Sequence, residues 1–88
     1  MSAPVVIFRV EPPYSEEARR SRHQGVVVLG VIVRKDGTLD ILRLVRGLGL
    51  GLDESAINAL KRWRFRPGVK DGVQVDVALN VEVSFTLR

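Results

Sequence analysis

The residues that could carry out chemistry in this chain are few, and their spacing favours no catalytic arrangement. The sequence has 88 residues, with one histidine, His23, and no cysteine. A Ser-His-Asp triad or a histidine-based metal site is improbable with one histidine, and a disulfide or zinc-thiolate site needs cysteine. Nothing in the pattern brings Asp53 and Glu54 into a concave site as an acid and a base. We therefore predict no catalytic residue, no metal site and no cofactor, in a domain that is not an enzyme.

A glycine-rich stretch resembles a phosphate-binding loop only superficially. Gly47, Gly49 and Gly51 alternate with single residues. The third glycine falls one residue early for the G-x-G-x-x-G pattern of dinucleotide-binding loops. Residues 26–46, just before this stretch, are predicted below to form a β-hairpin, which makes the local sheet antiparallel. Dinucleotide-binding loops belong instead to parallel βαβ units. We interpret this stretch as a flexible connection.

The basic run at residues 61–66 is the best argument for nucleic-acid binding. The chain has 14 Lys and Arg against 10 Asp and Glu, a formal net charge of +4. This charge permits binding to nucleic acid but does not demand it. At helical spacing Trp63 faces the core, while Lys61, Arg62 and Arg66 point outward. A small basic nucleic-acid binder that uses residues 61–66 stays open as an alternative from a different functional class.

The first half of the chain predicts a strand, a short helix and a hairpin. Residues 4–10 are rich in β-branched side chains and indicate a strand or extended arm. Ser15 is a suitable N-cap for a helix of about two turns. Residues 26–34 are apolar on both faces, which predicts a central strand covered on both sides. The Asp-Gly pair in residues 35–38 predicts a type I′ turn, in which both central residues have positive φ, and residues 39–46 form the returning strand.

The second half predicts a helix followed by a long strand. Asp53 is placed to cap the helix, whose buried stripe ends at Trp63 and whose last turn includes Arg64. Residues 73–87 then alternate apolar and polar without a break, which predicts a half-buried strand of about fifteen residues. The fold class is therefore α+β: a small antiparallel sheet, made of the hairpin and the long C-terminal strand, with two helices packed on one face. Residues 1–88 form one domain.

The long last strand is the feature with functional content. The hairpin offers about eight residues to pair with it, so part of its edge is expected to be unpaired. Such an edge either pairs with a second copy of the chain or accepts a partner's strand by β-augmentation. A strand paired along its whole length within the monomer is the third interpretation.

Several motifs together resemble the C-terminal domain of TonB-family energy transducers, over nearly the whole chain. The most specific is the block Arg62-Trp63-Arg64-Phe65-Arg66-Pro67 before a valine-rich last strand. Three further segments support it: Glu11-Pro12-Pro13-Tyr14, Asp36-Gly37-Thr38-Leu39 and Leu52-Asp53-Glu54-Ser55-Ala56. Glu11 and Ser15 stand where the family has glutamine and proline.

The resemblance implies a periplasmic domain of an inner-membrane-anchored protein that binds other proteins. In the family, an upstream anchor couples to the ExbB–ExbD motor, and the C-terminal domain captures the TonB box, a short peptide of an outer-membrane receptor, as an added strand. A second segment, near the first helix, contacts the receptor's plug. The resemblance places the binding residues on the last strand, at Val75, Asp76, Val77, Ala78, Leu79, Asn80, Val81, Glu82 and Val83, and in the second segment, at Arg9, Glu11, Pro12, Pro13 and Tyr14.

The sequence predicts no membrane-spanning helix in this chain. Its longest apolar run, residues 26–33, is far shorter than the ~20 residues that cross a bilayer, and no signal peptide precedes Pro4. We expect the chain to be soluble as it stands, with the family's anchor and Pro-rich spacer absent from it. A homodimer or a self-association module is the alternative within the same class of binding proteins.

Overall fold

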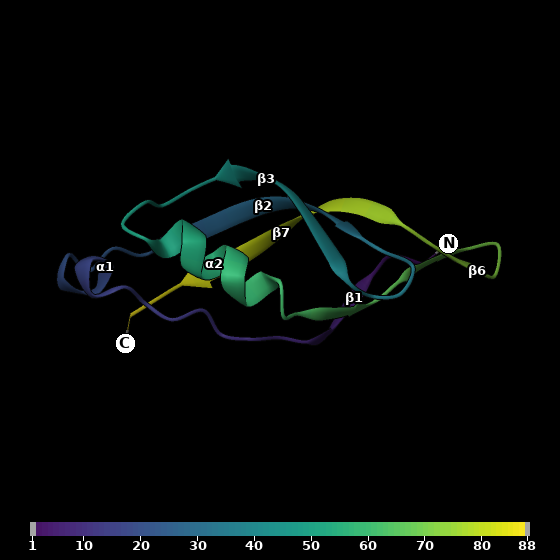
Figure 1. Cartoon of the computed structure of the whole chain (residues 1–88), viewed down its shortest axis with the longest axis horizontal. Coiled ribbons are helices and arrows are strands. Elements are labelled where there is room, and N and C mark those ends of the chain that lie inside the picture. Colours follow the sequence, from purple (N-terminus) through teal and green to yellow (C-terminus); the bar gives the residue numbers. More distant parts are fainter. Residues whose placement is uncertain (1, 88) are drawn as a thin grey trace.

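The computed structural model describes residues 2–87, and a three-stranded antiparallel sheet forms its centre (Figure 1). The sheet has the strand order β3-β2-β7, and two short two-stranded ribbons, β1–β4 and β5–β6, extend from it. Helix α2 packs against β2 and β3 on one face of the sheet. The elements are β1 (Val5–Phe8), α1 (Glu16–Arg20), β2 (Gly25–Val33), β3 (Leu39–Arg46), α2 (Leu52–Leu60), β4 (Arg64–Arg66), β5 (Gly68–Lys70), β6 (Val73–Val75) and β7 (Val77–Phe85).

The core lies between this sheet and the helices, which confirms the predicted α+β class. Strand β2 is central, as predicted, and every second side chain on it faces the helices and is buried. Strand β7 adds Val81, Val83 and Phe85 to the same layer, and Ala18 of α1 is fully buried there. The opposite face of β2 is less covered than predicted, since Val26, Val28 and Ile32 are only half-buried.

The hairpin turn forms where it was predicted but has a different type. Gly37 N–H donates to Arg34 O and Arg34 N–H donates to Thr38 O, both at 2.8 Å, so the loop has three residues. Only Gly37 has positive φ, +87°, which fits a type I turn followed by a left-handed glycine. Asp36 accepts hydrogen bonds from the Thr38 hydroxyl and N–H, which lower the pKa of its carboxyl group.

The second helix ends earlier than its sequence pattern predicts. It stops at Leu60, and Arg64–Arg66 form the strand β4, which pairs antiparallel with β1. Trp63 is nevertheless buried, with 4 % of its surface exposed. The predicted Asp53 cap is also wrong: Gly51 is the N-cap residue, and the Asp53 carboxylate accepts from the N–H groups of Leu48 and Gly49. These bonds hold the glycine-rich connection in place, although its composition predicts a flexible segment.

The predicted fifteen-residue last strand is two strands. The chain turns through Asp71 and Gly72, both with positive φ, so that β6 pairs with β5. Asp76 then interrupts the extended chain, because its carboxylate accepts from Lys35 N–H at 2.7 Å in the β2–β3 turn. Of these two strands, β7 is the one that pairs with β2, in register from Gly25↔Phe85 to Val33↔Val77.

Candidate functional site

Strand β7 has a partner on one side only within residues 2–87. The Arg34 N–H faces β3, and backbone groups alternate along a strand, so the backbone groups of Val33, Val31 and Leu29 face β7. Their partners Val77, Leu79 and Val81 therefore face β2. The residues between them on β7 present their N–H and C=O groups to the open edge; these are Ala78, Asn80, Glu82 and Ser84.

The side chains of β7 follow the same alternation. Val81 and Val83 are buried in the core, and Leu79 packs against it. Ala78, Asn80 and Glu82 are exposed on the face of the sheet away from the helices. An added strand would thus meet a row of unpaired backbone groups. The apolar side chains between them on β7 already pack in the core and hold the strand in place. A strand edge of this kind binds by main-chain hydrogen bonds, with little demand on the partner's sequence.

Two of the predicted strand residues do not belong to this edge. Val75 lies in β6 and pairs with Gly68 of β5. Asp76 lies between the two strands, and its carboxylate is engaged by the Lys35 N–H. Strand β7 therefore begins at Val77, and Ala78 is the first residue whose backbone groups face the open edge.

The second predicted segment, residues 9–14, is an extended connection pinned by the core. The Trp63 indole N–H donates to Val10 O at 2.9 Å, and the Ser55 hydroxyl donates to Pro13 O at 2.5 Å. Tyr14 donates its hydroxyl hydrogen to His23 O at 2.7 Å, and its ring packs edge-on against Phe85 at 5.5 Å. Tyr14 thus has a structural role, whatever it contacts in a partner. His23 is half-buried, with its Nε2 2.8 Å from Leu48 O.

The structure brings this segment to the C-terminal part of the open edge. A small pocket of about 110 Å³ lies between them, and the guanidinium of Arg9 stacks 5.0 Å from the centre of the Trp63 ring. The two predicted groups of binding residues thus meet at one place. The edge stays open beside Ala78 and Asn80, and the segment borders it farther along. The pocket is lined by Arg9, Val10, Glu11, Pro12, Trp63, Glu82, Val83 and Ser84.

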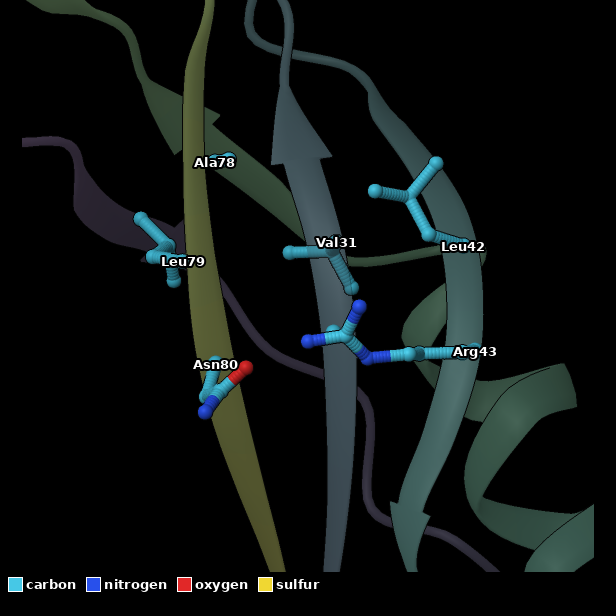
Figure 2. A pocket seen from close by; sticks show the side chains of 7 residues that line it. Val31, Leu42, Arg43, Ala78, Leu79 and Asn80 are labelled. Carbon is cyan, nitrogen blue, oxygen red and sulfur yellow. The ribbon is translucent and has the colours of Figure 1, made fainter.

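A larger pocket, which the sequence analysis missed, lies on the outer face of the sheet (Figure 2). Its volume is about 280 Å³. Gly30 of β2 pairs with Arg43 of β3 on one side and with Asn80 of β7 on the other. No signal in the sequence joins these three residues, because β-bulges shift the β2–β3 register on both sides of Gly30. The lining residues are Gly30, Val31, Leu42, Arg43, Ala78, Leu79 and Asn80.

The basic run at residues 61–66 does not lie on a helix, and its four basic side chains are exposed. It runs from Lys61, the C-cap residue of α2, to the end of β4, so its side chains do not share one helical face. The Arg64 guanidinium donates to the carbonyl oxygens of Lys61 and Trp63, at 3.2 and 2.8 Å, in the turn between α2 and β4. Trp63 is buried, as predicted, and Phe65 is buried beside it.

Residues 2–87 contain neither a metal-ligand cluster nor a helix able to span a bilayer. No group of three His, Asp or Glu side chains is placed to hold a metal ion among them. Their longest helix, α2, has nine residues, and none is long and apolar enough to cross a membrane.

Fold and edge together define a small α+β domain whose sheet leaves the edge of its last strand open. A family model described as Gram-negative bacterial TonB protein C-terminal matches residues 10–87. The chain belongs to this family of TonB C-terminal domains, as its motifs predicted. Membership also agrees with the prediction that the domain is not an enzyme.

Known relatives and a solved structure agree with this assignment. The chain is 31% identical over 85 residues to Protein TonB of Vibrio cholerae, an alignment that covers 96% of this chain and 35% of the relative. It is 32% identical over 88 residues to Protein TonB of Klebsiella pneumoniae, with coverage of 94% and 36%. The solution structure of the Pseudomonas aeruginosa TonB CTD matches the fold with a TM-score of 0.69 at 23% identity, over 99% of this chain and 89% of that one. The chain thus spans about a third of the length of the full TonB relatives.

Proposed function

We propose that this domain captures the TonB box of an outer-membrane receptor as a strand added to the open edge of β7. It would do so in the periplasm, as part of an inner-membrane-anchored TonB-type transducer driven by ExbB–ExbD. The observation that carries the proposal is the edge itself: the backbone groups of Ala78, Asn80, Glu82 and Ser84 face away from β2. Relatives named Protein TonB support the role in energy transduction.

The geometry suits a domain that must pull on what it binds. The free edge belongs to a strand paired with β2 over nine consecutive positions, and β2 is in turn paired with β3. A peptide pulled along the strand axis loads its backbone hydrogen bonds together rather than one after another. The force then passes into the strand pair with the most extensive pairing in the domain.

The segment at residues 9–14 is the second proposed contact. Its exposed Arg9 and Glu11 side chains border the β7 edge beside Glu82 and Ser84. Pro12 and Pro13 lie in the same extended segment, and Tyr14 anchors its end on Phe85. A receptor strand on β7 would therefore lie next to Arg9 and Glu11, which supports a contact between the receptor's plug and this segment.

Proline at position 80 tests strand addition directly. Because the Asn80 N–H faces the open edge, Asn80→Pro removes a donor that β2 does not use. We expect the fold to persist and the affinity for a synthetic TonB-box peptide to fall by about tenfold or more. The measurement is a chemical-shift titration of isotope-labelled protein, whose largest shifts should fall on the amides of residues 77–83.

Two further variants make the result specific. Asn80→Ala keeps the backbone N–H and should lose much less affinity than Asn80→Pro, whereas Leu79→Pro removes an N–H that faces β2 and should unfold the domain. If Asn80→Pro binds the peptide as tightly as the unmodified chain does, the edge of β7 is not the docking edge.

A further inference from the structure

Arg43 occupies an unusual place on the outer face of the sheet. Its side chain crosses β2 above Gly30: a Cβ built on Gly30 would lie 3.3 Å from Arg43 Cγ and 3.5 Å from its Nε. The same point lies 3.6 Å from Asn80 Oδ1. Since glycine has no side chain, the guanidinium can extend over β2 toward β7, as Figure 2 shows. The Arg43 side chain thus starts on β3 and places its guanidinium above β2, on the way to β7.

The charge of Arg43 is not used within the described chain. The ion pairs of residues 2–87 are Arg20–Glu16 and Arg34–Asp40, and neither involves Arg43. Asn80 turns its amide oxygen toward the Arg43 guanidinium, and its amide nitrogen points away from β2, toward the open edge (Figure 2). Both groups therefore offer hydrogen-bond donors to whatever lies beyond Asn80, and no carboxylate lines the pocket.

We propose that Arg43 and Asn80 form a specificity site for an acidic side chain on the strand that β7 binds. The inference rests on the proposed strand addition. An added strand lies about 4.8 Å beyond β7, and its residue opposite Asn80 points its side chain to the same outer face. That residue continues the row Arg43–Gly30–Asn80 by one position. A carboxylate there accepts from the Asn80 amide and from the guanidinium.

The reach across the sheet favours glutamate over aspartate. The carboxylate must lean back across Asn80 to meet a guanidinium that lies above β2, and the glutamate side chain is one methylene longer. Lysine at this position would place two cations on one row. We therefore expect the order Glu, Asp, Gln, Lys from tightest to weakest binding, with about fivefold between Glu and Gln, as for a partly exposed ion pair.

The test uses the whole 88-residue chain and a synthetic TonB-box peptide. Cross-strand NOEs first identify the peptide residue opposite Asn80, and that residue is then varied among Glu, Asp, Gln and Lys. Arg43→Gln should remove the preference for Glu over Gln, and Arg43→Glu should reverse it in favour of Lys. Arg46→Gln removes the same charge from the same strand, one row away beside Val28, and should leave the preference unchanged.

The outcomes separate this inference from the proposed function. Peptides that bind along β7 with equal affinity for all four residues overturn the specificity site and leave strand addition standing. A preference that survives Arg43→Gln, or that Arg46→Gln abolishes equally, also overturns it, because net charge would then be the cause. Peptides that give no NOEs to β7 overturn strand addition, and the specificity site with it.

Discussion

Replacing Trp63 by alanine should destabilise the domain by about 3–5 kcal/mol, the typical cost of removing a large buried aromatic side chain. The ring is 96 % buried and packs beside Phe65, with ring centres 6.4 Å apart. The same change deletes the indole N–H that donates to Val10 O and the surface on which Arg9 stacks. Chemical denaturation monitored by far-UV circular dichroism measures the loss. A domain of this size has a total stability of about 5–15 kcal/mol, so the loss is a large share of the whole.

Trp63→Phe keeps the prediction testable if the alanine variant does not fold. Phenylalanine retains a ring but lacks the N–H donor, so we expect a smaller cost of about 1–2 kcal/mol. It should also raise amide hydrogen exchange in residues 9–12, because their anchor on the indole is gone. Arg62→Ala is the matched control, since this side chain is exposed and its loss should change stability by about 0.5 kcal/mol at most. Equal stabilities for Trp63→Ala and Arg62→Ala would contradict the structural role of the indole.

The sequence correctly predicted that Trp63 is buried, but it placed this residue on a helix that in fact ends before it. Its spacing from Leu60 fits a helical stripe, yet the helix ends at Leu60 and Trp63 lies just before β4. After the helix the chain turns, with Arg64 donating to Lys61 O and Trp63 O, and the Trp63 side chain is buried at this turn. Hydrophobic patterns thus predicted which side chains are buried better than they predicted where the elements end.

The alternation of residues 73–87 shows the same limit. It predicted a half-buried strand, and three of its apolar positions, Val81, Val83 and Phe85, are indeed core residues. The break at Asp76 depends on its contact with the Lys35 N–H, which is 41 positions away in the sequence and has no local signature. One signal was nevertheless available: Asp71-Gly72 repeats the Asp-Gly pair of the first hairpin and predicts the turn between β5 and β6.

The candidate site divides in a similar way. The sequence predicted an open edge on the last strand, but for an incorrect reason: β7 pairs with β2 over its whole length, and its other side is open because the sheet ends there. The meeting of this edge with residues 9–12 could not be predicted, because the Trp63–Val10 hydrogen bond that places the segment joins residues 53 positions apart. The Arg43–Gly30–Asn80 row depends on a register that two bulges shift, so it too is visible only in the folded chain.

The second large effect that we expect is at Gly37, where the β2–β3 turn meets the start of β4. Gly37 is buried, has a φ of +87°, and accepts a hydrogen bond from Phe65 N–H at 3.1 Å. A Cβ at this position would collide with the carbonyl oxygen of Phe65, a backbone atom that cannot move aside as a flexible side chain would. Gly37→Ala should therefore combine left-handed strain with displacement of β4, at a total cost of about 3–4 kcal/mol.

Gly72→Ala is the matched control for this prediction. Gly72 has a similar φ of +78°, in the turn between β5 and β6, but a Cβ there would have no heavy atom within 4 Å. Strain alone should then cost about 1–2 kcal/mol. Urea denaturation of the two variants separates strain from collision, and equal costs would mean that the turn does not press on β4. A larger cost at Gly37 would instead mean that this contact couples the central sheet to the β1–β4 ribbon, from which residues 9–14 continue toward the β7 edge.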